Sequence, residues 1–200
     1  SLTLLVIPTD TPGFAVKQTL RKLGMHTSPT GWLTFDHCRV PKRNLLGRPH
    51  LGYHYAAQNL LEERLVGGVS AVAVARLVVD ETIAHLRQRR AFDRRLADLQ
   101  ALRHRIAELA ADVEMSQRFV YSVCESFRDG RVEAKEICMI KFRVYEIVQE
   151  VVTRCLQLFG GAGFMEDCWV ARVYRDIRVL SIGGGTSELM KDLTAAYLRL

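Results

Sequence analysis

Two adjacent carboxylates, Glu62 and Glu63, lie within a run of apolar residues in the stretch NLLEERLVGG, residues 59–68. If this run forms a buried helix, at least one of them lies away from free water, and a buried carboxylate is costly unless it is paired or takes part in chemistry. Adjacent helical residues point about 100° apart, so the two cannot face the same site. Two interpretations follow: one residue is a catalytic base, or both are surface charges on a half-buried helix.

Two glycine-rich segments could approach a ligand closely. In SIGGGTSELM, residues 181–190, three glycines precede Thr186 and the expected start of a helix, whose free N–H groups attract an anion. A phosphate site is one interpretation, and an ordinary loop before a helix is the other. The second segment, LQLFGGAGF at residues 156–164, is equally consistent with a ligand-binding turn and with a helix C-cap.

Positive residues are densest in HLRQRRAFDRRL, residues 85–96, in a chain whose formal net charge is +6. A basic patch can meet nucleic acid, a membrane surface or the phosphates of a ligand. No aromatic interleaving and no zinc-ligand spacing accompany this one, which disfavours nucleic acid. Phe92 among the arginines indicates either a guanidinium on a phosphate with an aromatic ring against a ring system, or an aromatic anchor in a helix–helix turn.

The elements that must position these residues change in type near residue 50. Up to about residue 47 the chain is β-rich, with a strand over 1–8 and a period of two over 31–41 that predicts a sheet with one buried face. A period near 3.6 then predicts helices over about 53–90, 97–129, 132–158 and 187–199. Long helices joined by short loops form antiparallel bundles. The expected fold is therefore mainly α: an antiparallel four-helix bundle over 51–200, preceded by a partial β domain over 1–50.

Glycines 67 and 68 interrupt the first expected helix, where each costs about 1 kcal/mol relative to alanine. A close neighbour, either backbone or ligand, would explain the pair. The five cysteines are an odd number, and the closest two are Cys155 and Cys168, which excludes CxxC zinc or redox motifs and favours buried reduced thiols. No apolar run approaches the roughly 20 residues of a membrane span. No signal peptide is visible and the chain does not start with methionine, so a fragment or a processed chain is expected.

The motifs gain specificity from their order. VPKRNLLG, EERL, QRRAF, QLFGGAGF, YRDIR and IGGGTSELM follow one another along the chain. In this order and spacing, nearly all 200 residues resemble the C-terminal half of the acyl-CoA dehydrogenase family. The resemblance implies the second part of the family's middle β domain and its C-terminal four-helix bundle, with FAD at the domain junction and across a dimer interface. It also implies fatty acid metabolism, an acyl-CoA or acyl-carrier substrate, electron-transfer flavoprotein as acceptor, and a homodimer or homotetramer.

The resemblance also assigns residues to FAD. It implies that Arg89 meets the pyrophosphate of a neighbouring subunit's FAD beside Phe92, and that Gln100 lies near the adenine. It implies a turn for the partner's adenosine, formed by Gln157, Gly160 and Gly161. It also implies that Thr186 and Glu188 lie near the phosphates and ribose. One departure is Asp93, where the family usually has glycine. An acid beside a diphosphate is unfavourable unless Arg94 or Arg95 pairs with it.

The family removes the pro-R α-proton of a thioester and sends a β-hydride to flavin N5. So weak a carbon acid needs a positioned carboxylate in a dry site and a carbonyl held by hydrogen-bond donors. Many members place this Glu at the position of Gly184 here, whereas the long-chain and isovaleryl enzymes place it on the first bundle helix, directly before Arg-Leu. That position is Glu63, so the resemblance implies Glu63 as the base, with Gly184 making room for it, and Glu62 in solvent or a local ion pair.

Arg64 matches the family's contact to the CoA moiety, and the alternative is an ion pair with Glu62 or Glu63. No metal site is expected. Two alternatives to a dehydrogenase stay open: a non-catalytic helical module that dimerises or binds another subunit without FAD, and an oxidase-type relative with another electron acceptor. The expected compartment is the bacterial cytoplasm or the mitochondrial matrix.

Overall fold

The computed structural model describes residues 1–200. The chain divides into two compact units, Ser1–Leu61 and Glu62–Leu200, which are described separately. Helix α1 (Gly52–Gln88) begins in the first unit and continues into the second. The domain boundary predicted between residues 50 and 51 stays a prediction, and it lies close to the start of this helix.

The first unit contains two separate antiparallel strand pairs. Strand β1 (Leu4–Leu5) pairs with β4 (Leu45–Leu46), and β2 (Phe14–Leu20) pairs with β3 (Thr30–Phe35), with an irregular register between Val16 and Gln18. A single 3₁₀ turn, η1 (Lys42–Asn44), precedes β4. The predicted strand over 1–8 is therefore only two residues long, and the one over 31–41 ends at Phe35.

The prediction that this sheet has one buried face is wrong within the first unit. Trp32, Leu33 and Phe35 keep 51%, 47% and 54% of their surfaces exposed. Successive strand residues point to opposite faces, so Trp32 and Leu33 together mean that both faces of the hairpin are open. A two-stranded ribbon has no second layer to pack against, and alternation in sequence cannot reveal whether such a layer is present.

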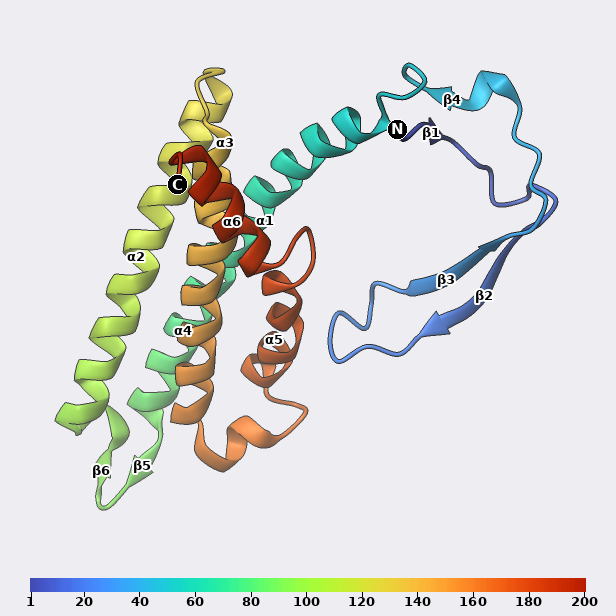
Figure 1. The fold of residues 1–200 in the computed structure, drawn as a ribbon. Helices are drawn as coiled ribbons and strands as arrows, with labels where there is room; N and C mark the ends of the chain where they lie inside the picture. Colours follow the sequence, from blue (N-terminus) through green and yellow to red (C-terminus); the bar gives the residue numbers. More distant parts are fainter. The chain divides into compact units, whose positions relative to one another are not determined.

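The second unit is the helical bundle, and the prediction of a mainly helical fold is confirmed (Figure 1). After α1 come β5 (Arg90–Ala91), β6 (Arg94–Arg95), η2 (Leu96–Asp98), α2 (Gln100–Arg128), α3 (Ala134–Met139), the π-helical turn η3 (Ile140–Val144), α4 (Tyr145–Leu158), η4 (Gly160–Phe164), α5 (Trp169–Ile177), η5 (Arg178–Ser181) and α6 (Ser187–Tyr197). Elements α3, η3 and α4 follow one another directly and replace the single helix expected over 132–158. The short helix α5 was not predicted.

The bundle core consists mainly of β-branched and other aliphatic side chains on the facing sides of its helices. It includes Val72, Ala75 and Val78 of α1, Leu109, Val113 and Val120 of α2, Val148, Val151 and Val152 of α4, and Met190 of α6. Burying each valine or larger side chain contributes about 1.5–3 kcal/mol relative to leaving it exposed. The core therefore fixes the spacing of α1, α2 and α4, on which the site residues depend.

Gly67 and Gly68 allow α1 to approach η3 and the start of α4 closely. A Cβ on Gly67 would lie 2.1 Å from the Tyr145 hydroxyl oxygen, and one on Gly68 would lie 2.5 Å from Cγ2 of Ile140. Both distances are far below van der Waals contact. The close neighbour predicted for this pair is confirmed, but it is a pair of side chains rather than backbone or ligand.

All five cysteines are free, and no group of three or more His, Cys, Asp and Glu side chains is arranged to hold a metal. Cys138 and Cys155 are buried, and burial raises the pKa of each thiol. The other three are partly exposed, so the expectation of buried thiols holds for two. None of the helices has the length and apolar character that a membrane crossing requires.

We predict that Gly68→Ala destabilises the chain by about 1–2 kcal/mol. Overpacking against the buried Ile140 costs about 1–3 kcal/mol, and only part of that is offset by the better helix propensity of alanine. Urea unfolding followed by circular dichroism measures the difference. The control is Gly161→Ala, whose new Cβ meets nothing within 4 Å and which we expect to change stability by less than about 0.5 kcal/mol. Equal stability of the Gly68→Ala and parent chains would contradict the packing described here.

Candidate functional site

Glu63 lies at a cavity of about 240 Å³ within the helical unit. Three parts of the chain form its wall: one turn of α1, the π turn with the start of α4, and the segment that leads from η5 toward α6. The lining residues are Glu63, Arg64 and Gly67, then Lys141 and Tyr145, then Val179, Leu180, Gly183 and Gly184. The structure therefore brings together Glu63 and Gly184, two positions that sequence analysis had linked across 120 residues.

The geometry at Gly184 supports the idea that a side chain there and the Glu63 side chain use the same space. A Cβ on Gly184 would lie 3.8 Å from Oε1 of Glu63 and 3.7 Å from Cε of Lys141. Gly184 and Gly185 both have positive φ values, +68° and +106°, which favour glycine. The Glu63 residue is exposed, so the chain's own residues leave its carboxylate open to water.

Arg64 is buried, with 8% of its surface exposed, and its Nε donates a 2.8 Å hydrogen bond to the Gly184 carbonyl. None of the ion pairs in the structure joins it to Glu62 or Glu63, so the alternative of a helix-surface ion pair is wrong. The guanidinium instead ties α1 to the glycine-rich segment. Its predicted contact with CoA stays a prediction.

Lys141 is a site residue that sequence analysis missed. Only 2% of its surface is exposed, its Nζ donates to the Leu180 carbonyl, and it lies 4.8 Å from the centre of the Tyr145 ring. Burial lowers the pKa of Lys141, the neighbouring Arg64 lowers it further, and the negative charge of Glu63 raises it. A signal was available, because a lone lysine interrupts the apolar run ICMIKF at a spacing that puts it on the same helix face as Ile137 and Val144.

Tyr145 connects Lys141 to α1. Its hydroxyl donates a 3.0 Å hydrogen bond to the Arg64 carbonyl, in the space that Gly67 leaves open. Burial raises the pKa of Tyr145, and the negative charge of Glu63 raises it further, so the phenol stays protonated and keeps its donor. The cavity wall is thus a closed series of contacts that runs from α1 through Tyr145 and Lys141 to the glycine-rich segment and back through Arg64.

The second group of predicted residues lies at the hairpin between α1 and α2. Arg89 is exposed directly after α1, Phe92 is 84% exposed at the tip, and Gln100 is the exposed first residue of α2. Phe92 and Asp93 have φ values of +53° and +61°, both in the left-handed region. Aspartate adopts this conformation more readily than most residues, which explains how it stands where glycine is expected.

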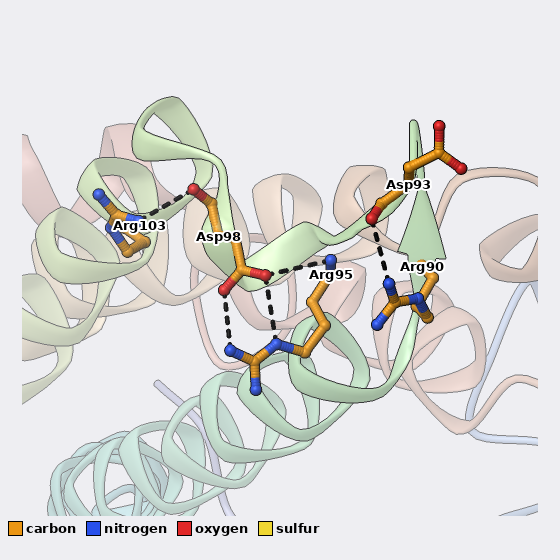
Figure 2. Close-up of polar contacts among 5 residues, drawn as sticks. All are labelled: Arg90, Asp93, Arg95, Asp98 and Arg103. Atoms are coloured by element: carbon orange, nitrogen blue, oxygen red, sulfur yellow. Dashed lines mark hydrogen bonds and ion pairs between the residues drawn. The ribbon is translucent and has the colours of Figure 1, made fainter.

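Asp98 fixes the base of this hairpin (Figure 2). Its carboxylate accepts hydrogen bonds from the Arg95 guanidinium at 3.0 and 3.2 Å and from the Arg95 backbone amide at 3.2 Å. The Arg95 guanidinium holds the pKa of Asp98 below its usual value. Arg95 therefore pairs with Asp98 and not with Asp93, whose backbone carbonyl accepts from Arg90 at 3.1 Å. The Arg95 pairing weighed for Asp93 is wrong, and Arg94 forms no ion pair with Asp93 either.

The third predicted group, Gln157, Gly160 and Gly161, lies at the same end of the bundle as the hairpin (Figure 1). The two helix ends are joined by the stacked rings of His85 and Phe159, whose centroids are 4.4 Å apart. All three predicted residues are exposed, and a Cβ on either glycine would meet nothing within 4 Å. A ligand or another chain can therefore reach this turn.

The start of α6 holds the remaining predicted pair. Thr186 caps the helix, because its Oγ1 accepts from the Leu189 amide at 3.3 Å. Glu188 is exposed, and hydrogen bonds from its own amide and from the Thr186 hydroxyl lower its pKa. Both residues line a cavity of about 400 Å³. Two buried polar atoms at this cavity have no hydrogen-bond partner, namely Oγ of Ser187 and Nε2 of Gln149.

The predicted residues are therefore not one site within a single chain. Gln88 lies 25 residues after Glu63 on α1, which corresponds to about 37 Å at 1.5 Å per residue, and the hairpin follows at the far end. One end of the bundle holds Glu63, Gly184, Thr186 and Glu188. The other end holds Arg89, Phe92, Gln157 and the exposed glycines Gly160 and Gly161.

Comparison with known proteins identifies a family. The family profile "Acyl-CoA dehydrogenase, C-terminal domain" matches residues 50–198. The chain is 34% identical over 197 residues to the rat mitochondrial long-chain specific acyl-CoA dehydrogenase, covering 98% of this chain and 46% of that protein. It is 31% identical over 197 residues to isovaleryl-CoA dehydrogenase of rice, with coverages of 98% and 48%.

A solved structure agrees with these relatives. The acyl-CoA dehydrogenase of Geobacillus kaustophilus is 37% identical, superposes with a TM-score of 0.96, and is matched over 99% of this chain and 52% of that one. The chain thus spans about half the length of the proteins it matches.

We predict that Asp98→Ala releases the base of the hairpin and speeds hydrogen exchange at the Arg95 amide, which loses its acceptor. In the parent chain the pH dependence follows from the lowered pKa of Asp98: protection is full above the ordinary carboxyl value of 3.8 and is lost as pH falls through the lower folded value. NMR-detected exchange, corrected for intrinsic rates, measures both effects. Asp129→Ala, which removes an Arg-paired acid at the other end of α2, should leave the Arg95 amide unchanged. An Arg95 amide equally protected in Asp98→Ala would refute the assignment.

Proposed function

The chain belongs to the acyl-CoA dehydrogenase family, and we propose that it takes part in FAD-dependent α,β-dehydrogenation of an acyl-CoA thioester with Glu63 as the base. The observation that carries this proposal is the approach of Glu63 to Gly184, at which an added Cβ would lie 3.8 Å from the Glu63 carboxylate. A carboxylate from either position would reach the same reacting atom. Only Glu63 supplies one in this chain.

The chain's own residues suit a proton transfer. Glu63 would take the α-proton of the thioester, and a positioned general base contributes about 10²–10⁴-fold to a rate. Because the chain leaves this carboxylate exposed, water would be excluded by the substrate and whatever else covers the cavity. Glu62 is also exposed, but it does not line the cavity and has no role in the proposal.

The residues at the start of α6 fit the polar part of FAD. Buried polar groups are almost always paired, so the unpartnered Ser187 hydroxyl and the unpartnered Nε2 of Gln149 call for a hydrogen-bonding partner in the cavity they line. Arg178 and the N-terminus of α6 at the same cavity suit a phosphate. Thr186 and Glu188 would hold this polar part of the cofactor. The flavin ring of the bound cofactor would supply the acceptor for the hydride from the β-carbon.

The residues at the other end of the bundle would serve a second subunit. About 37 Å of α1 separates them from the Glu63 cavity, so the hairpin and the glycine turn are available to a neighbouring chain. We therefore propose that Arg89, Phe92, Gln100 and the turn at Gln157, Gly160 and Gly161 contact the FAD of a partner copy. A homodimer or homotetramer follows from this arrangement.

The substrate and partners are proposed from the relatives. Two of them are named for long-chain acyl-CoA and for isovaleryl-CoA, and we propose an acyl-CoA or carrier-bound acyl thioester of long or branched chain. Electron-transfer flavoprotein is the proposed acceptor. The relatives include mitochondrial and bacterial proteins, and the proposed compartment is the mitochondrial matrix or the bacterial cytoplasm.

We predict that Glu63→Gln lowers the dehydrogenation rate of the FAD-loaded protein by about 10³-fold or more, because the amide cannot take up the α-proton. Stopped-flow bleaching of the flavin absorbance on mixing with acyl-CoA measures the step. The matched control is Glu62→Gln, which removes the adjacent exposed carboxylate and should keep the parent rate within about twofold. A Glu63→Gln variant with near-parent activity would end the proposal.

Moving the carboxylate gives a second, independent prediction. The single variant Glu63→Gly should be inactive, and adding Gly184→Glu should restore part of the activity because the new side chain enters the same space. Recovery will be incomplete, since the positive φ of 68° at this position strains any residue other than glycine. The rate of each variant is compared at equal FAD occupancy. No recovery in a folded, FAD-loaded double variant would show that the two positions are not equivalent.

A non-catalytic helical module is the second candidate, because the chain's own residues leave the Glu63 carboxylate open to water. The flavin absorbance spectrum of the purified chain separates the two. A yellow chain with bound FAD supports the enzyme, and a colourless chain that still dimerises supports the module. Turnover with oxygen rather than electron-transfer flavoprotein would indicate the oxidase-type relative.

A further inference from the structure

The cavity at Glu63 contains an imbalance of charge that the proposed proton transfer does not explain. Arg64 and Lys141 are both buried, and neither forms an ion pair. Burying a cation without a paired anion is costly, so such residues are retained where they have a function. Glu63 supplies the carboxylate that lines the same cavity, and the Glu63 residue is exposed to solvent.

The two cations hold one short segment from two different helices. Arg64 on α1 donates to the carbonyl of Gly184, and Lys141 on the π turn donates to the carbonyl of Leu180. These carbonyls lie four residues apart, with Gly183 between them. Together the cations fix where this segment lies against Glu63, and losing either leaves one end of the segment without its anchor.

Lys141 is also linked to α1 through Tyr145. Its ammonium lies over the Tyr145 ring, and the Tyr145 hydroxyl is bonded to the Arg64 carbonyl, one peptide from Glu63. The titratable and charged groups that act on Lys141 are Arg64, which opposes its charge, and Glu63, which favours it. The position of Lys141 is therefore linked to Glu63 both through bonded contacts and through charge.

We propose that Lys141 is a positioning residue for Glu63: its buried ammonium anchors the Leu180 carbonyl and provides the counter-charge that holds the carboxylate at the cavity facing Gly184. This inference rests on the proposed role of Glu63 as base. Lys141 acts through Glu63 and through the glycine-rich segment.

A titration of the 200-residue chain tests the link without FAD or substrate. With ¹⁵N-labelled lysine, the ammonium of Lys141 is followed by NMR against pH in the parent, in Glu63→Gln and in Glu62→Gln. Because the charge of Glu63 raises the pKa of Lys141, we expect a downward shift of its midpoint in Glu63→Gln and none in Glu62→Gln. An unmoved midpoint in Glu63→Gln, or equal shifts in both variants, overturns the proposal. This measurement does not require any Lys141 variant to fold.

A double-mutant cycle in the FAD-loaded protein provides the functional readout. The rate is the exchange of the α-protons of an acyl-CoA with D₂O, and the variants are Lys141→Met, Glu63→Gln and both together. Positioning predicts that Lys141→Met lowers the rate about tenfold with Glu63 present and by less than about twofold in the Glu63→Gln background. A role confined to fold stability predicts equal losses in both backgrounds and overturns the proposal. Lys135→Met, which removes a half-exposed lysine that forms an ion pair with Glu133, should keep the parent rate.

The outcomes also separate this inference from the proposed function. If Glu63→Gln keeps the parent exchange rate, the proposed function fails, whatever Lys141 does. If Glu63→Gln is inactive while Lys141→Met matches the parent, the function stands and the inference alone is overturned.

Discussion

The structure of the Glu63 site depends on a single constraint: α1 must lie close enough to the π turn for side chains of both to bind the segment that runs from η5 to the start of α6. Gly67 and Gly68 make that approach possible, because a Cβ at either position would overlap Tyr145 or Ile140. Once the elements are this close, Arg64 and Lys141 reach carbonyls of the same segment. The left-handed glycines of that segment then turn its backbone toward the carboxylate.

The sequence predicted the bundle for a physical reason, whereas the link between Glu63 and Gly184 came from the family resemblance. The helical period of the apolar residues follows from burial of one helix face, and it extends over enough residues to be unambiguous. It did not predict Lys141, because a lysine in a helix normally indicates a solvent-facing position and its burial depends on how three elements pack. The short helix α5 was missed for the related reason that nine residues hold too few periods to be distinguished from a loop.

Two other differences arise from packing partners that a local pattern cannot specify. The alternation over residues 31–41 predicted a buried face, yet Trp32 and Phe35 are about half exposed, because the first unit has no second layer to cover the hairpin. The pairing weighed for Asp93 failed because Asp98 offers Arg95 both a carboxylate and an acceptor for its backbone amide. Asp93 and Asp98 lie at similar distances from Arg95 along the chain. Only the three-dimensional turn places the Asp98 carboxylate, and not that of Asp93, against Arg95 (Figure 2).

The π turn at Ile140–Val144 has a consequence for how this chain can vary in length. A π turn takes up one more residue than an α turn, and such turns are frequent at functional sites. It sets the rotational phase between α3, which contacts α6, and α4, which contacts α2 and α5. A deletion of one residue in the regular α-helical parts on either side would rotate every side chain beyond it by about 100°, whereas the wider π turn is the place where one extra residue is absorbed. The α-helical parts between Ala134 and Leu158 are therefore intolerant of single-residue insertions and deletions, so divergence in them must proceed by substitution.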